Sequence, residues 1–210
     1  MSIKHIIFDM DGTLSNTAIA TAAAIKQVND KYNLPKITDE HIRNTMGIGG
    51  LEFHATLFPT LPMETLLKVE QDVDRLEEEH IVKMGEKMLF DGVKDMLAKL
   101  TARQNITIHI ASTGSKRHVH ATLTATGIYD LFTSISCDEP AKIDMVKKIV
   151  GNSDPAGWAM VGDMYKDSEA ARGNGILALG AEFGYLVKEN FSLFDYVLSV
   201  PGDIFQYMAC

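Results

Sequence analysis

The chain has 210 residues, of which 46% are hydrophobic and 23% charged, with 28 acidic against 20 basic side chains. The apolar fraction is sufficient for a buried core and excludes a disordered chain. The net charge of −8 argues against a broad basic surface for nucleic acid. Cys137 and Cys210 form no CxxC pair, so we expect neither a disulfide framework nor a structural zinc site. The sequence has no apolar run that suits a signal peptide or a membrane span, and we expect a cytoplasmic protein.

The predicted elements fall into two kinds of segment. Residues 16–86 are helical in pattern throughout. The rest of the chain alternates strand and helix, and parallel strands need such a crossover between them. The alternation therefore predicts a doubly wound, Rossmann-like α/β core of residues 1–15 and 87–210, with residues 16–86 inserted after the first strand as a helical cap domain. The strands are expected over residues 3–8, 106–110, 158–161, 176–179 and 196–198.

Within the insert, turn residues separate the predicted helices. Helices are expected over 18–32, from about residue 38, in a short segment that ends at Pro59, and over 62–84. The last helix carries the acidic run Glu77-Glu78-Glu79, which we expect to be a solvated face.

The first of four polar clusters, Asp9-Met10-Asp11-Gly12-Thr13, follows the first strand at its carboxyl end, where doubly wound folds bind ligands. Residues two apart on an extended chain point the same way, so both carboxylates can face one site. With a divalent cation they could divide the work. One would stay ionised as nucleophile and metal ligand, while the other would have a raised pKa and carry a proton. The alternative is a simple turn at a strand end.

The other three clusters follow later strands. Ser112 and Thr113 open a helix, where hydroxyl and N–H groups either bind phosphate or cap the helix. Lys142 lies just inside another helix, as a point charge for a phosphoryl group or as a solvated surface side chain. Asp163 and Asp167 either add oxygen ligands suited to magnesium or cap the helix that follows.

In this order the four clusters resemble the motifs of the haloacid dehalogenase superfamily over nearly the whole chain. Asp9-x-Asp11-Gly12-Thr13 is similar to the first motif, Ser112 to the second, Lys142 to the third, and Gly162-Asp163-x-x-x-Asp167 to the fourth. The helical insert between the first two motifs resembles the subgroup that contains phosphoglycolate phosphatase and β-phosphoglucomutase.

The resemblance implies that Asp9 attacks phosphorus and becomes an aspartyl phosphate. Asp11 would protonate the leaving oxygen and then activate water. A carboxylate at position 11 favours a phosphatase or mutase over a dehalogenase, because an alkoxide needs a proton and a halide does not. Mg²⁺ would be held by the Asp9 carboxylate, the Asp11 backbone carbonyl and Asp163, with Asp167 in support. The phosphoryl oxygens would be held by Lys142 and by Ser112 or Thr113.

In capped members of this group the cap closes over the substrate, and its loops select the leaving group. The corresponding loop here, Gly47-Ile48-Gly49-Gly50, is uncharged and suggests a mobile lid with hinges near 14–17 and 85–90. Arg43 and His54 flank it as polar candidates for specificity.

We expect a small phosphomonoester as substrate, phosphoglycolate-like or a sugar phosphate. The expected protein is a monomer or weak homodimer with no nucleic-acid or membrane partner. A phosphomutase is the second hypothesis, which the uncharged loop disfavours, because a mutase needs cap side chains that grip a second phosphate or sugar. A non-catalytic phosphate-binding domain is the third.

Overall fold

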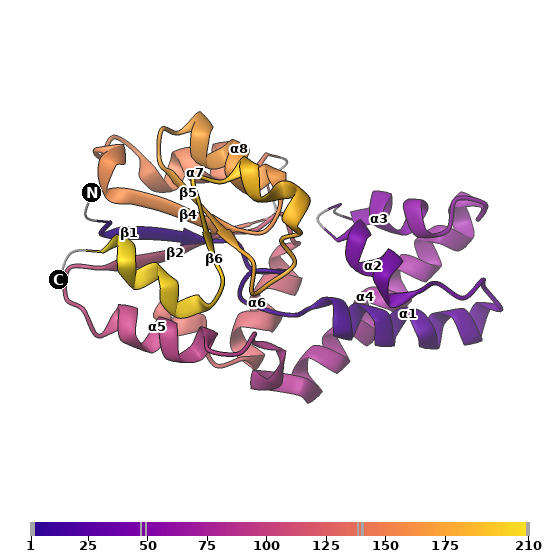
Figure 1. Cartoon of the computed structure of the whole chain (residues 1–210). Helices are drawn as coiled ribbons and strands as arrows, with labels where there is room; N and C mark the ends of the chain where they lie inside the picture. The colour runs from indigo at the N-terminus through magenta and orange to yellow at the C-terminus, as the bar shows by residue number, and fades with distance from the viewer. Residues whose placement is uncertain (1–2, 47, 49, 138, 140, 209–210) are drawn as a thin grey trace.

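The computed structural model describes residues 3–46, 48, 50–137, 139 and 141–208. At its centre lies a six-stranded sheet in the order β3-β2-β1-β4-β5-β6 (Figure 1), and every neighbouring pair of strands is parallel. The predicted doubly wound α/β fold is therefore confirmed. The strands are β1 (His5–Phe8), β2 (Thr107–Ala111), β3 (Ser134–Ser136), β4 (Trp158–Gly162), β5 (Leu177–Ala181) and β6 (Tyr196–Leu198).

The side chains of strand β1 are buried on both faces of the sheet. Ile6, Ile7 and Phe8 are fully buried, and successive side chains of a strand point to opposite faces. Ile6 and Phe8 pack into the hydrophobic cluster that includes residues of α5 and α6, while Ile7 packs into the cluster that includes residues of α7 and α8. Burial on both faces explains why β1 reads as a continuous apolar run. The four helices are α5 (Val93–Thr101), α6 (Lys116–Ala125), α7 (Lys142–Val150) and α8 (Tyr165–Gly173).

The order of the strands reverses beside β1. From β1 the chain winds to β2 and β3 on one side, and it then returns to pair β4 on the other side of β1. In open α/β sheets this reversal leaves a crevice at the carboxyl ends of the two strands concerned. The segments that follow β1 and β4 therefore border one site.

Four helices pack together beside the sheet (Figure 1) and are called here the helical lobe, residues 18–84. The lobe has a hydrophobic cluster of its own, which includes Ile25, Phe53, Leu66 and Val69. The C-terminal end of its longest helix also packs toward the core, where Ile81 lies against Met88 and Ala125. The lobe helices are α1 (Ala18–Tyr32), α2 (Asp39–Thr45), α3 (Gly50–Leu57) and α4 (Met63–Met84).

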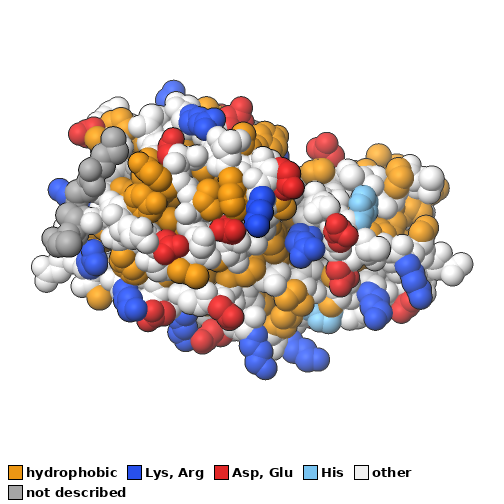
Figure 2. Space-filling model, viewed as in Figure 1, with side chains coloured by type: hydrophobic (Ala, Val, Ile, Leu, Met, Phe, Trp, Pro, Cys, Tyr) orange, Lys and Arg blue, Asp and Glu red, His pale blue; other side chains and the backbone are white. Residues whose placement is uncertain are grey.

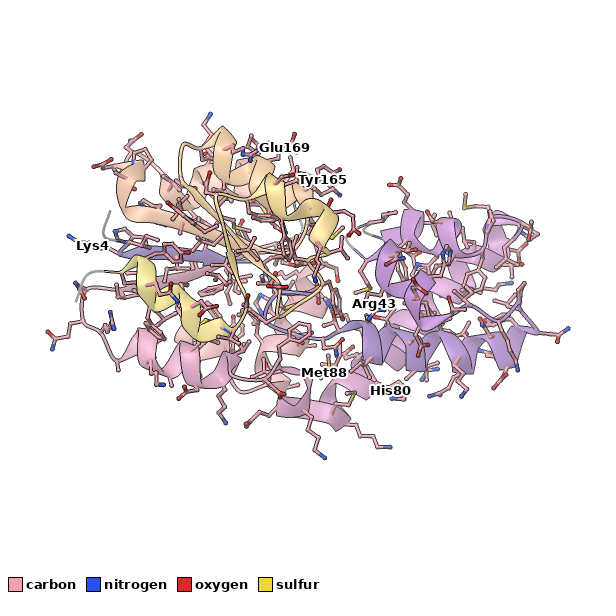
Figure 3. The ribbon with its side chains drawn as sticks, in the orientation of Figure 1. Lys4, Arg43, His80, Met88, Tyr165 and Glu169 are labelled. Atoms are coloured by element: carbon pink, nitrogen blue, oxygen red, sulfur yellow. The ribbon has the colours of Figure 1, made fainter. Side chains whose placement is uncertain are left out.

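The two chain segments that join the core to the lobe are paired with each other. The N–H of Asn16 donates a hydrogen bond to the carbonyl of Met88 (2.7 Å), and the N–H of Phe90 donates one to the carbonyl of Leu14 (3.1 Å). Both expected hinges thus belong to one short antiparallel ribbon, and Met88, which is part of it, is labelled at the core–lobe junction in Figure 3.

Shorter elements complete the chain. The edge strand β3 was not predicted, because three residues, two of them serine, give no period-2 hydrophobic signal. Among the described helices, none combines the length and the apolar character that crossing a membrane requires. Acidic and basic side chains are intermixed over the face shown in Figure 2. Short 3₁₀ helices lie at Gly85–Met88, Tyr129–Leu131, Pro155–Gly157, Lys188–Leu193 and Pro201–Tyr207.

Candidate active site

A buried lysine joins two of the acidic clusters at the carboxyl edge of the sheet. The N–H of Asp9 extends the β1–β4 pairing by donating to the carbonyl of Val161 (2.9 Å), which fixes the backbone at this position. Nζ of Lys142 lies 2.7 Å from Oδ2 of Asp9 and 2.7 Å from Oδ1 of Asp167. All three side chains are buried. The alternative of a solvated surface Lys142 is therefore wrong.

Three carboxylates converge on this point. Asp9, Asp163 and Asp167 each have an oxygen within 4.8 Å of the others. Asp163 accepts a hydrogen bond from the hydroxyl of Thr13 (2.6 Å), which follows β1, so the first and fourth clusters are in direct contact.

Asp167 holds the loop after β4 in place. Its Oδ2 accepts hydrogen bonds from the N–H groups of Asp163 (3.1 Å) and Met164 (2.9 Å), while its Oδ1 binds Lys142. These bonds cap the start of α8, as the helix-capping alternative expected, although Asp167 does so from the third residue of the helix and not from the N-cap position. Its role as a metal ligand stays a prediction. Both oxygens of Asp9 are engaged too, by the N–H of Met10 (2.8 Å) and by Lys142, so an ion at this point would share these carboxylates with the donors already present.

The charges of this cluster do not balance. Three carboxylates face the single ammonium of Lys142 in a buried site, so their full ionisation would leave an excess of negative charge. Burial raises the pKa of Asp9 to about 7, and repulsion from Asp167 adds to this effect against the attraction of Lys142. Burial, together with Asp167 and Asp9, also raises the pKa of Asp163 well above its usual value. The excess negative charge and the hard oxygen donors fit a divalent cation such as Mg²⁺.

The side chain of Asp11 has a different set of partners. Its Oδ1 lies 2.9 Å from Nε2 of His118, whose Nδ1 lies 3.2 Å from Oε2 of Glu77 in the helical lobe. Burial alone would raise the pKa of Asp11, but the charge and hydrogen bond of His118 outweigh it and leave that pKa below its usual value. The expectation that the second carboxylate has the raised pKa is therefore wrong for this arrangement.

Glu77 also corrects the interpretation of the acidic run as a solvated face. Its side chain is only 14% exposed, because it turns toward His118 across the junction between α4 and α6. The neighbouring Glu78 pairs with Arg117, and only Glu79, which pairs with Arg75 along α4, is largely exposed. Two of the three acids thus contact the core.

Gly12 permits the close approach of three segments. Its φ is +80°, and a Cβ there would lie 2.5 Å from Cδ2 of Tyr185 and 2.6 Å from Oδ2 of Asp163. The carbonyl of Gly12 also accepts a hydrogen bond from the N–H of Tyr185 (2.9 Å). A side chain at this position would displace a candidate metal ligand.

A cavity of about 170 Å³ lies between the core and the helical lobe. This volume is below the range of about 300–1,000 Å³ that is typical of drug-sized ligands, so it suits a small molecule. Ser112 and Thr113 both line it, and the hydroxyl of Ser112 accepts a hydrogen bond from the N–H of Gly114 (3.1 Å). The core contributes Asp9, Asp11, Ser112, Thr113, Gly114, Ser115, His118, Lys142, Asp163, Met164, Lys166 and Tyr185, and the lobe contributes Thr21, Met46, Ile48, Gly50, Phe53, His54, Val73, Asp74 and Glu77.

The specificity candidates in the lobe have different positions. His54 is 3% exposed and lines the cavity, as does Gly50, which begins α3. Arg43 is exposed on α2 and is not a lining residue, although Figure 3 shows it on the side of the lobe near the core. Gly47 and Gly49 lie outside the described residues.

Sequence reasoning missed several residues of this cavity. His118 was considered only as a metal ligand together with His120, and nothing in local spacing indicates a partner 107 residues away. Glu77, Thr21 and Asp74 lie at positions that a helical pattern marks as ordinary. Their role depends on how the lobe docks on the core.

Comparison with known proteins agrees with the fold and identifies the family. The sequence profile of the haloacid dehalogenase-like hydrolase family matches residues 6–181. The chain belongs to this family, as its motifs suggested, and the prediction of an enzyme of the hydrolase class is confirmed.

Three known proteins illustrate the relationship. A phosphoglycolate phosphatase from Synechococcus elongatus is 26% identical, over 97% of this chain and 96% of its own. The pyrophosphatase PpaX from Oceanobacillus iheyensis is 32% identical, over 80% of this chain and 78% of its own. The structure of the HAD-hydrolase YfnB from Bacillus subtilis, bound to magnesium and described as revealing interdomain movement, has a TM-score of 0.70 at 17% identity, with 98% of each chain covered.

Proposed function

We propose that this protein is a Mg²⁺-dependent phosphatase that hydrolyses a small phosphomonoester through an aspartyl-phosphate intermediate. The observation that supports this most directly is the buried cluster in which Lys142 bridges Asp9 and Asp167 at the switch point of the sheet. Asp9 and Asp163 would hold the metal, with Asp167 in support and the backbone carbonyl of Asp11 as a further ligand. When bound, Mg²⁺ polarises phosphoryl oxygens and offsets the excess of negative charge.

The residues of the chain account for both halves of the reaction. A carboxylate oxygen of Asp9 forms a bond to phosphorus while the bond from phosphorus to the leaving oxygen breaks, and Asp11 passes to that oxygen the proton that it shares with His118, whose pKa is raised. Water then attacks the acyl phosphate, Asp11 takes up a proton from it, and inorganic phosphate leaves with Asp9 restored. Lys142 and the hydroxyl of Ser112 or Thr113 stabilise the charge of the transferring group. Division into two displacements makes each step easier.

The cavity narrows the class of substrate. Phosphoglycolate carries a carboxylate on its leaving group, whereas a sugar phosphate presents neutral hydroxyls. The lobe residues described as lining the cavity include two carboxylates, Asp74 and Glu77, and no Lys or Arg. We therefore favour a neutral, hydroxylated leaving group, although the relative from Synechococcus elongatus is a phosphoglycolate phosphatase. The same wall disfavours a phosphomutase, which must hold a second phosphate.

The domain division also belongs to this proposal. Residues 16–86 would act as the cap that covers the substrate, and residues 1–15 and 87–210 as the catalytic core. The predictions of a cytoplasmic location and of a monomer or weak homodimer stay predictions.

The test is hydrolysis of a panel of phosphate esters by the purified protein, with Mg²⁺ and with a chelator. We expect turnover of at least one ester that requires Mg²⁺. We also expect a loss of about 10⁴-fold or more in Asp9→Asn, the order of loss when a catalytic nucleophile is removed. Asp95→Asn, which changes an exposed carboxylate paired with Lys99, is the matched control. Retained turnover in Asp9→Asn would refute the nucleophile, while binding of phosphate esters without any turnover would favour the non-catalytic hypothesis.

A further inference from the structure

We propose that His118 is a positioning residue for Asp11, and that Glu77 of the helical lobe completes this arrangement when the lobe lies against the core. The inference rests on the proposed function, in which Asp11 protonates the leaving oxygen. According to this inference, α6 of the core and α4 of the lobe together fix the orientation of the Asp11 carboxylate.

The imidazole of His118 lies between two carboxylates from different parts of the chain. Nε2 contacts Oδ1 of Asp11 at 2.9 Å, and Nδ1 contacts Oε2 of Glu77 at 3.2 Å. The three side chains are 14–18% exposed, so little water competes for these contacts. Because both ring nitrogens are engaged, the plane and the direction of the ring are fixed at the same time.

The backbone of His118 is fixed as well. Ser115 caps α6, and its hydroxyl accepts a hydrogen bond from the N–H of His118 (3.2 Å). His118 therefore lies in the first turn of a capped helix, a rigid place from which to hold a second side chain.

The contact gives Asp11 a defined orientation beside a competing cation. The charge of Lys142 also acts on Asp11, and Lys142 already binds Asp9 and Asp167. With Oδ1 held by His118, the carboxylate is kept from turning into that cluster. General acid catalysis requires such placement, because proton transfer depends on hydrogen-bond reach.

The lobe contributes Glu77 from a supported position. Glu77 accepts a hydrogen bond from the hydroxyl of Thr21, so α1 and α4 hold it together. One residue further, Glu78 accepts a hydrogen bond from Nε of Arg117 (2.6 Å). These two adjacent contacts both join α4 to α6, but only the contact of Glu77 continues to Asp11. The pair at Glu78 therefore provides a control for lobe docking alone.

The test compares two esters with His118→Gln and Glu77→Gln. The ratio kcat/KM reports the steps up to the first irreversible one, in which the leaving group departs. An alkyl phosphate such as glycerol 3-phosphate needs a proton on its leaving oxygen, while p-nitrophenyl phosphate releases a stable phenolate. We expect His118→Gln to lower kcat/KM for the alkyl ester by about 10²-fold, at the low end of general acid catalysis. For the p-nitrophenyl ester, the same variant should show a much smaller decrease in kcat/KM. Glu77→Gln should show the same selectivity with a smaller loss.

The matched controls are His120→Gln, on the same helix beside Tyr129, and Glu78→Gln. Both should leave the ratio of the two esters unchanged. Equal losses on both esters would overturn the positioning role, and so would a Glu78→Gln variant that behaves as Glu77→Gln does. Unchanged kinetics in His118→Gln and Glu77→Gln would overturn it too. If the wild-type protein hydrolyses no ester of the panel with Mg²⁺, these two included, the proposed function itself fails, which is a distinguishable result.

Discussion

Lys142 holds its ammonium nitrogen 2.7 Å from Oδ2 of Asp9, and the two side chains are 5% and 8% exposed. A buried ion pair of this kind contributes little net stability, but the loss of one partner leaves the other charge uncompensated. Here the partner left behind is a set of three carboxylates. The lysine therefore matters for the folded protein before any substrate binds.

We expect Lys142→Met to destabilise the metal-free protein by about 3–5 kcal/mol, the usual cost of breaking a buried pair. Mg²⁺ should raise the melting temperature of this variant more than that of the wild type, because the ion replaces part of the missing positive charge. Activity should fall by about 10²–10³-fold, as for other removed donors to a developing charge. Thermal unfolding with Mg²⁺ or a chelator, together with ester hydrolysis, measures all three effects.

Lys148→Met is the control for this variant. Lys148 lies on the same helix and pairs with Glu139, but its side chain is 65% exposed. Its replacement should change stability and activity little. Equal behaviour of the two variants would contradict the bridging role of Lys142.

The stability of the metal-free protein should fall as the pH rises. The pKa of Asp9 is raised to about 7, so the folded protein keeps a proton that the unfolded chain releases near its ordinary value of 3.8. Between these values the folded state binds more protons, and its stability decreases with increasing pH. The raised pKa of His118 acts in the same direction, because its contribution is lost as the pH rises through the folded value. The lowered pKa of Asp11 acts oppositely, but only below its ordinary value.

Calorimetry from about pH 6.5 to about pH 8 tests this expectation, because the pKa of His109, which burial lowers to about 4, acts oppositely only below its ordinary value of 6.5. The melting temperature should decrease across the range in a chelator. Mg²⁺ should reduce that slope, because metal binding requires deprotonated ligands and displaces their protons. A melting temperature that rises with pH, or a slope that Mg²⁺ leaves unchanged, would contradict the assignment of Asp9 and Asp163 to one buried site.

Gly12→Ala should disrupt the metal site as well as the fold. Two effects combine there, the strain of a positive φ and the overlap of a Cβ with Tyr185 and Asp163. Gly127→Ala separates them, because Gly127 has a φ of +72° and a Cβ there meets nothing within 4 Å. The control should lose about 1–3 kcal/mol from strain alone. Gly12→Ala should lose more and should also bind Mg²⁺ more weakly in a calorimetric titration, whereas equal losses would show that the overlap is relieved without consequence.

The residue types at the strand ends allowed most of the proposed site to be predicted from the sequence. Asp9, Lys142 and Asp163 follow or precede elements whose order alone brings them to one edge of the sheet. The direction of the pKa of Asp11 could not be predicted, because it depends on His118, which lies far away in the sequence. The same holds for Glu77. Helical periodicity indicates which side of α4 is apolar, but it does not indicate that Glu77 contacts His118 of the core.

The two carboxylates on the lobe wall should control the choice of leaving group. Asp74 lines the cavity, and burial raises its pKa, with Glu77 adding repulsion. We expect Asp74→Asn to improve kcat/KM for phosphoglycolate relative to glycerol 3-phosphate by about tenfold or more, because two like charges about 4 Å apart repel by about 1 kcal/mol in water and by more in a protein site. Asp72→Asn, on the same helix but paired with Lys31, is the control. An unchanged preference in Asp74→Asn would contradict the proposed role of this wall.

The ribbon formed by residues 14–16 and 88–90 has a mechanical consequence. Two hydrogen-bonded strands that cross a junction side by side bend together, and they resist rotation of one part about the other. We therefore expect any opening of the helical lobe to be a hinge rotation about a single axis. Such a rotation would separate Glu77 from His118 when the lobe opens and would restore the same contact between them when it closes.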